Sequence, residues 1–286
     1  FGSAPGTLNT ANETRLLGKA NLDWQVDRYN RVKIGGEYTQ YELDTYNVGA
    51  ASQGFSDIWK ASPVRYNLFA EDRLDLGDVV LVGSLRYDYY KLGAEKWKDF
   101  PRISSWPGFT PDSLEGRLEE YSAHSYVSPH IQVAFPVTER TNFRLSYGQQ
   151  VQTPDFATML FGSNTDLATT NTNQNYGTDL DFGKTILFEF GVRHAFSDDM
   201  VFDVTVFNKD NLANAAGRLL FPIDPRTGSP GNVRATVNAD FGNTRGIDMR
   251  LDRRIGNIFN GALAYTYQDA RNTGSDPYSY INFGAR

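Results

Sequence analysis

The stretch TILFEFGVRHAFSDDMVFDVTVFNKD, residues Thr185–Asp210, decides the fold of this chain. Apolar residues recur at every second position in both halves, as Ile186, Phe188, Phe190 and Val192 and then as Phe202, Val204 and Val206. Between the halves, Ser197, Asp198 and Asp199 are residue types that favour a tight turn. Each half is about ten residues long, whereas a usual strand has five or six. Two such strands, each with one apolar and one polar face, are typical of an outer-membrane barrel with lipid outside and a wet lumen inside.

The same alternation extends over the rest of the chain and predicts ten strands in all. Besides the two strands of Thr185–Asp210, we expect strands at Leu17–Val26, Arg31–Leu43, Val64–Leu74, Val79–Lys91, His124–Phe135, Thr141–Val151, Arg245–Arg253 and Ile258–Asp269. The predicted fold class is all-β, a transmembrane antiparallel up-and-down β-barrel. Charges at Arg144, Glu189, Arg193 and Asp203 are expected to face the lumen and to pair across neighbouring strands.

The connections between these strands alternate between short and long. Short polar turns, such as Asp27–Asn30 and Pro136–Arg140, join the two strands of each pair. The connections between pairs are long, and they are Asp44–Ala61, Leu92–Ala123, Gln152–Lys184 and Asn211–Thr244. Long structureless loops are uncommon in compact soluble domains, but short turns at one end and long loops at the other are the rule in outer-membrane barrels. A soluble sandwich or propeller would explain the alternation of apolar and polar residues. It would explain neither the length of the strands nor the regular succession of short and long connections.

The composition argues against several other classes of protein. Without cysteine, the 286 residues offer no disulfide framework and no thiolate chemistry. No run approaches the roughly 20 apolar residues of a membrane helix. A net charge of -6 without a basic patch argues against nucleic acid as a partner.

Both ends of the sequence suggest a piece of a longer chain. Phe1 is not an initiator and no signal peptide follows it, and the pattern breaks off within a connection at Arg286. In lipid every backbone N–H and C=O must be paired, so a barrel needs a closed sheet. We therefore expect residues 1–286 to be an internal portion of a barrel domain, completed by strands from elsewhere in the chain.

Three stretches of this sequence resemble the barrel of TonB-dependent outer-membrane transporters. The first runs from Val127 through the Pro136–Thr141 segment to Phe156, the second is Lys184–Arg193, and the third combines Asn243–Asp248 with Ala264–Tyr267. The chain looks closest to the branch with a carboxypeptidase-regulatory-like N-terminal domain, the Oar-like proteins. It departs from the family pattern at Phe182-Gly183, where a Pro-Glu pair commonly precedes the Lys-Thr.

The resemblance implies a barrel of about 22 strands, filled by an N-terminal plug and driven by a TonB-type energy-coupling protein. It implies uptake of a bulky nutrient, such as a ferric siderophore, cobalamin, a glycan or a peptide, across the outer membrane of a Gram-negative-type bacterium. The plug and the N-terminal domain are not found in residues 1–286, so coupling would operate through the missing N-terminal part. Two alternatives remain: a non-transporting barrel that displays long loops for adhesion or complex assembly, and a passive porin.

The sequence predicts no catalytic site, metal site or cofactor. His124, His130 and His194 lack the spacing of a zinc site, and no nucleophile motif occurs. Acidic segments such as Gly177–Asp181 are interpreted as solvated loops. Binding residues concentrate on loops held by a rigid scaffold, so the candidate contacts to ligand or partner are aromatic residues of the long loops: Trp59, Trp97, Trp106, Phe109, Phe161 and Tyr176. The alternative is that these rings pin the loops together or lie at the headgroup belt. The expected partners are the lipid bilayer, an unknown ligand and, as a further possibility, a surface lipoprotein or complex partner.

Overall fold

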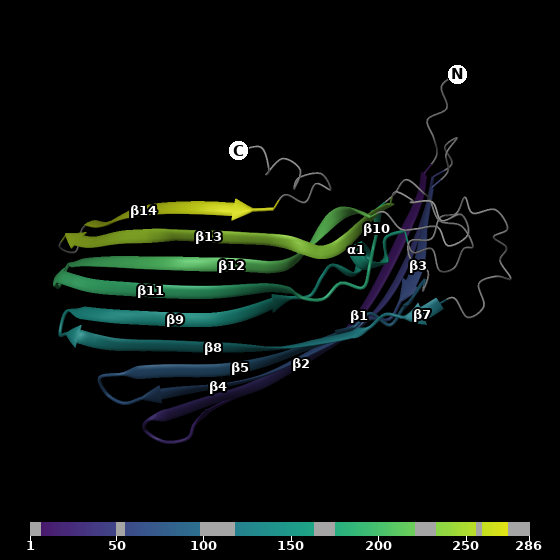
Figure 1. Ribbon diagram of the computed structural model, residues 1–286. Coiled ribbons are helices and arrows are strands. Elements are labelled where there is room, and N and C mark those ends of the chain that lie inside the picture. The colour runs from purple at the N-terminus through teal and green to yellow at the C-terminus, as the bar shows by residue number, and fades with distance from the viewer. Residues whose placement is uncertain are drawn as a thin grey trace, which may run out of the picture.

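The computed structural model describes residues 7–49, 55–97, 118–162, 175–220, 233–255 and 259–273. Its main body is one curved sheet of 12 strands (Figure 1). The long strands pair antiparallel with their neighbours in chain order. They are β1 (Thr7–Gln25), β2 (Asn30–Gly49), β4 (Val64–Asp75), β5 (Val80–Lys91), β8 (Ala123–Thr138), β9 (Thr141–Gln152), β11 (Gly183–Ser197), β12 (Met200–Leu220), β13 (Val233–Ile255) and β14 (Phe259–Asn272). These ten strands confirm the predicted all-β class and its up-and-down order.

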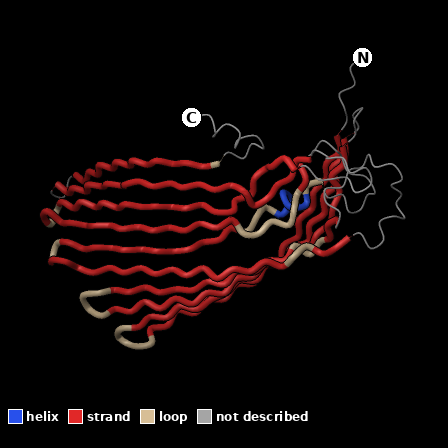
Figure 2. Tube along the Cα trace, in the orientation of Figure 1, coloured by secondary structure: helices blue, strands red, loops and turns tan. Residues whose placement is uncertain are grey.

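Short turns lie together at one end of the sheet, and the described parts of the long connections lie at the other (Figures 1 and 2). Local side chains close the turns: the Asp27 carboxylate accepts hydrogen bonds from the backbone N–H of Tyr29 and Asn30, at 2.7 and 2.9 Å. In the next turn Gly77 has a φ of 85°, a conformation that favours glycine. No helix within the described ranges is long and apolar enough to cross a membrane.

The register sorts the side chains onto two faces. One row across β8, β9, β11, β12, β13 and β14 consists of Val133, Leu145, Phe190, Val206, Ile247 and Tyr267. The row one residue further along consists of Ala134, Arg144, Gly191, Thr205, Asp248 and Thr266. We call these sides the apolar face and the polar face. Large side chains of the apolar face, Phe190 and Val206 among them, are exposed, as expected for a surface that meets lipid.

One ion pair on the polar face crosses an intervening strand. The guanidinium of Arg144 on β9 reaches β12, where Nη2 lies 2.6 Å from Oδ1 of Asp203 and 3.1 Å from Oγ1 of Thr205. Between them on β11 stands Gly191, where a Cβ would lie 3.0 Å from two nitrogens of Arg144. The glycine therefore leaves the space that the guanidinium occupies, and the predicted cross-strand pairing is confirmed for Arg144 and Asp203.

Three connections predicted as loops contain regular structure. In the first, β3 (Phe55–Ala61) pairs with the far end of β2, and in the second, β6 (Glu95–Trp97) pairs with β7 (Leu118–Glu120). The third contains α1 (Phe156–Leu160) and β10 (Asn175–Tyr176). Such short elements carry too few residues for a periodic pattern to show in the sequence.

Several strands also run beyond their predicted ends. β1, β2, β12 and β13 continue past the apolar alternation, because backbone pairing persists where apolar and polar side chains no longer alternate. The turn predicted at Pro136–Arg140 is shorter, since β8 continues to Thr138. The register shifts between Pro136 and Thr138, an irregularity that suits proline because it has no N–H to donate.

A small apolar core lies at the end with the long connections, where α1 is found (Figure 2). Its buried members come from β3, from the end of β5 and from the connections, and they are Trp59, Ala61, Tyr90, Leu92, Tyr121, Met159, Leu160, Leu180 and Phe182. This core fixes long connections onto the sheet, and it positions the site described next.

Candidate functional site

The connection between β9 and β11 packs against the polar face of the sheet. We call its described parts, residues 153–162 and 175–182, the strap. The first part contains α1, which begins after Asp155; the Asp155 carboxylate accepts a hydrogen bond from the N–H of Thr158 at 3.1 Å, as an N-cap does. The second part passes through β10 and continues into β11.

The two parts of the strap contact each other closely at Gly177. Its N–H donates to the carbonyl of Phe161 at 2.8 Å. A Cβ at Gly177 would lie only 1.9 Å from the carbonyl oxygen of Met159. Only glycine allows the two backbones to approach in this way.

Aromatic side chains hold the strap onto β5 and onto the segment before β8. Phe182, 1% exposed, packs edge-on against Tyr90, with ring centroids 4.9 Å apart. The hydroxyl of Tyr90 donates to the carbonyl of Leu180, and the hydroxyl of Tyr121 donates to the carbonyl of Met159 at 3.1 Å. Fully burying a large apolar side chain stabilises the folded state by about 1.5–3 kcal/mol. The burial of Phe182 against Tyr90 therefore holds the strap firmly on the sheet.

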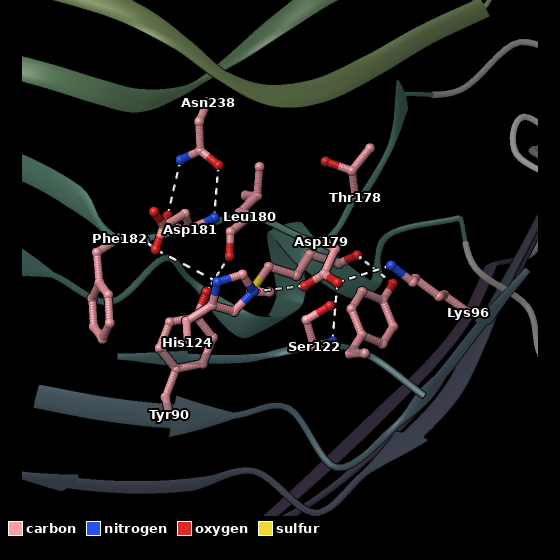
Figure 3. A network of polar contacts seen from close by, with 12 residues as sticks. Tyr90, Lys96, Ser122, His124, Thr178, Asp179, Leu180, Asp181, Phe182 and Asn238 are labelled. Atoms are coloured by element: carbon pink, nitrogen blue, oxygen red, sulfur yellow. Dashed lines mark hydrogen bonds and ion pairs between the residues drawn. The ribbon is translucent and has the colours of Figure 1, made fainter. Parts of the chain in front are cut away.

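Asp179 is the charged centre of the attachment (Figure 3). Its Oδ2 accepts hydrogen bonds from Nζ of Lys96 at 2.8 Å and from the N–H of Ser122 at 3.0 Å, while Oδ1 lies 2.8 Å from Nε2 of His124. Burial by itself would raise the pKa of Asp179, but the hydrogen bonds from His124, Lys96 and Ser122 outweigh it and hold the pKa well below its usual range. The carboxylate is therefore ionised and satisfied by three separate groups.

The strap is also attached to β12 and β13 on its other side. The side chain of Asn238 accepts from the N–H of Asp181 at 2.7 Å and donates to the carbonyls of Asp181 and Ala213, at 2.9 and 2.7 Å (Figure 3 shows the contact with Asp181). Thr178 donates to the carbonyl of Thr236, and β10 pairs in parallel with β13. The amide of Asn238 thus holds the strap by its backbone, independently of the strap's side chains.

At its first part the strap reaches β2 and β3. The ring of Phe156 lies edge-on to Tyr41 of β2 at 5.5 Å, and the N–H of Gly162 donates to Oδ1 of Asp57 on β3 at 2.9 Å. The strap therefore spans the polar face from β2 and β3, past β5 and β8, to β13. The strap is therefore fixed to the polar face of the sheet, at the end with the long connections.

Two cavities lie beside the strap on the polar face. The upper one, of about 590 Å³, lies between the first part of the strap and β1, β2 and β3. The lower one, of about 420 Å³, lies between the end of β9 and the polar face of β1, β2, β4 and β5. Among the described residues no group of three His, Cys, Asp or Glu side chains could hold a metal ion.

The predicted contact residues occupy different places. Trp59 is 5% exposed in the core and lines the upper cavity, whereas Phe161 is 37% exposed just after α1. Trp97 lies in β6 and Tyr176 in β10. Trp106 and Phe109 lie outside the described residues. As contacts to a ligand or partner, all six remain predictions.

The interpretation of Gly177–Asp181 as a solvated loop was wrong, since Asp179 is 15% exposed and pairs with Lys96 and His124. No periodic pattern in the sequence indicates this attachment, because the two side chains that pair with Asp179 are 55 and 83 residues away. One signal was available in the sequence. Gly177 precedes Asp179, and the apolar residues Leu180 and Phe182 follow it, whereas a solvated loop would be polar throughout.

Comparison with known proteins supplies the family. A sequence model described as TonB dependent receptor-like, beta-barrel, matches residues 2–285. No curated protein sequence matches the chain.

Solved structures with the same fold include the FrpB iron transporter from Neisseria meningitidis (F3-3 variant), with a TM-score of 0.60 at 16% identity over 92% of this chain and 36% of that chain. The outer membrane transporter YddB from Escherichia coli has a TM-score of 0.64 at 12% identity, over 93% of this chain and 34% of that one. A double mutant of the Serratia marcescens hemophore receptor HasR, in complex with its hemophore HasA and heme, has a TM-score of 0.59 at 18% identity, over 93% of this chain and 43% of that chain. At these identities the likeness shows the fold, and the chain spans less than half the length of each.

Proposed function

Since the chain belongs to the TonB-dependent receptor-like β-barrel family, we propose that it forms part of the wall of an outer-membrane transporter that takes up a bulky nutrient with energy supplied by TonB. The family consists of transport receptors, which are not enzymes. Residues 1–286 would be an internal portion of the barrel domain, with the plug and the TonB contact elsewhere in the longer chain. The Oar-like branch stays a prediction.

The observation that carries this proposal is the strap. A barrel that only displayed its loops would gain nothing from folding a connection onto the lumen-facing side and fixing it there through Asp179, Asn238 and Tyr90. A strap in this position narrows the lumen mouth and creates cavities that a captured ligand can occupy. Binding residues on a rigid support are the usual design of recognition sites.

The nutrient is drawn from the classes that such receptors take up: a ferric siderophore, cobalamin, a glycan or a peptide. The structural neighbours are described as carriers of iron and copper, and one as a hemophore receptor. Those descriptions apply to the neighbours, and they support transport by this chain without selecting its substrate. The HasR complex with its hemophore HasA supports a protein partner as a second kind of ligand.

The test is uptake by cells that carry the intact chain. We would compare accumulation of iron-loaded siderophores, heme, cobalamin and neutral oligosaccharides in the parent strain, in a strain lacking this protein and in a strain lacking TonB. Transport predicts that at least one compound accumulates in the parent strain and falls to background in both deletion strains.

The other two functions give different results. A passive porin would lose uptake when the protein is removed but not when TonB is removed. A display barrel would leave every uptake unchanged in both strains. Either result would contradict the proposal.

A further inference from the structure

We infer that the two cavities beside the strap form one groove that binds a neutral oligosaccharide. This inference rests on the proposed transport function and names its substrate class. The cavities measure about 590 and 420 Å³ and adjoin at Arg65 and Thr153, which line both. Each volume lies in the range of small-molecule sites, roughly 300–1,000 Å³, so together they suit an extended ligand of several units.

The floor of the groove carries charged and amide side chains of the polar face. Those of β2, β4 and β5 that line the cavities are Glu37, Arg65, Asn67, Arg86 and Asp88, with the ring of Phe69 among them. Each arginine carries five N–H donors, and each carboxylate supplies acceptors. The floor therefore offers both donors and acceptors to a ligand.

The lower cavity also has uncharged polar side chains. Asn67, which is 8% exposed, lines it together with Asn21, Gln152 and Thr153. An amide side chain both donates and accepts hydrogen bonds. These groups can therefore bind the hydroxyls of a ligand.

The charges of the groove nearly cancel. In the lower cavity Lys19, Arg65 and Arg86 face Glu37 and Asp88, and the upper cavity adds Glu13 and Asp155. Arg86 lies 2.8 Å from Asp88, and Arg65 lies 3.9 Å from Glu37. A site for a phosphate or another anion would carry an excess of positive charge. A balanced set of both signs favours a ligand without net charge.

Sugars fit this arrangement better than peptides do. An extended peptide is commonly recognised by adding a strand to a sheet edge, but β2, β4 and β5 are paired on both sides and present only their face. A sugar ring offers hydroxyls that both donate and accept, so it can contact an arginine and a carboxylate of the same pair through the donors and lone pairs that they do not use on each other. Its C–H face packs on apolar and aromatic surface, which Tyr41, Leu43 and Phe156 supply in the upper cavity.

The test measures binding to the intact chain, purified in detergent, by isothermal titration calorimetry. The probes are linear hexasaccharides of α1,4- and β1,4-linked glucose, of xylose and of mannose. We expect one of them to bind, and Arg86→Ala to weaken that binding by about tenfold or more, since a hydrogen bond to a charged group is lost. Arg86→Lys should recover only part, because a lysine lacks the planar fork of donors.

Arg250→Ala is the matched control. Arg250 pairs with Asp252 two residues away at 2.8 Å, as Arg86 pairs with Asp88, and it lies on the polar face of β13 outside both cavities. Its removal should leave binding unchanged. Correct folding of each variant is checked by the heat-dependent shift of the barrel on a gel.

Three results would overturn the inference. The first is that no probe binds. The second is that a hexapeptide binds in the same Arg86-dependent manner while the sugars do not, and the third is that Arg86→Ala and Arg250→Ala weaken binding equally. Failure of the transport proposal looks different. In that case a sugar would bind through Arg86, but no uptake would depend on TonB.

Discussion

At the scale of single residues, the polar face is held together by side chains that join segments far apart in the sequence. Asp179 connects the strap to Lys96, Ser122 and His124, and Asn238 holds the strap backbone beside β12. Each of these side chains satisfies two or more partners at once. Removing one partner of such a buried group costs more than the bond itself contributes, because the others are left unpaired.

Replacing Asp179 by Asn tests the charged attachment. The substitution removes the negative charge that Lys96 and His124 contact and keeps the size of the side chain. We expect the strap to be weakened by about 1.5–3 kcal/mol, the range for hydrogen bonds to charged groups. Faster amide hydrogen exchange at Ser122 in the intact chain would measure this loss.

Asp198→Asn is the control for that experiment. The Asp198 side chain is 96% exposed in the β11–β12 turn and lies 3.5 Å from Arg140. An exposed pair of this kind contributes little, so exchange at Ser122 should not change. Equal exchange at Ser122 in wild type and Asp179→Asn would show that the attachment does not depend on the charge.

The depressed pKa of Asp179 predicts how the strap responds to acid. Hydrogen bonds from His124, Lys96 and Ser122, working against burial, hold this pKa below its usual value. Such a group stabilises the folded state at any pH above the unfolded pKa, about 4, and the stabilisation is lost as pH falls through the folded pKa. Limited proteolysis should therefore find the strap equally protected from about pH 8 to about pH 4 and exposed only below that. Loss of protection between about pH 7 and pH 5 would contradict this explanation.

At the scale of elements, the strap depends on a backbone contact that leaves no room for a side chain. Gly177→Ala would place a Cβ against the carbonyl of Met159, since the ideal position is 1.9 Å away. We expect the two parts of the strap to separate at a cost of about 1–3 kcal/mol, as in other overpacked sites, while the long strands stay paired. Proteolytic cleavage within residues 153–162 or 175–182, with an intact barrel on a gel, is the expected result.

Gly83→Ala provides the comparison. A Cβ at Gly83 meets nothing within 4 Å, so this strand glycine should accept alanine without loss. If Gly177→Ala were cleaved no faster than Gly83→Ala, the close approach would not hold the strap together.

The elements differ in how far the sequence could predict them. Regular alternation predicted β4, β5 and β9 to within one or two residues, because the whole of each strand has one apolar and one polar face. The outer parts of β12 and β13 lack that alternation, so only their inner halves were predicted. The strap is held by contacts such as Asp179 with Lys96 and Asn238 with Asp181, and no local pattern encodes contacts across 83 or 57 residues.

At the scale of the whole molecule, the two faces of the sheet differ in whether they tolerate a charge: the apolar face meets lipid and the polar face meets water. Phe190→Arg places a charge in the apolar row beside Leu145 and Val206. In lipid this costs about 2–4 kcal/mol near the bilayer midplane. We expect a lower urea midpoint for the folded barrel in liposomes.

The neighbouring substitution Glu189→Arg serves as the control. Glu189 lies on the polar face opposite Ser146, where an arginine remains in water. The midpoint should stay close to that of the parent chain. A similar loss for both substitutions would contradict the assignment of the two faces.

The most direct test of the whole account is a nitroxide scan along β11. The chain has no cysteine, so single cysteines can be introduced at each position from Ile186 to Arg193 and labelled in the intact protein in liposomes, once any cysteine elsewhere in the longer chain has been replaced. The account predicts that oxygen, which concentrates in lipid, reaches the labels at Ile186, Phe188, Phe190 and Val192, and that the labels between them are shielded from it. Equal access of a water-soluble nickel complex to both sets would mean that the apolar face does not meet lipid, and a membrane barrel would be ruled out.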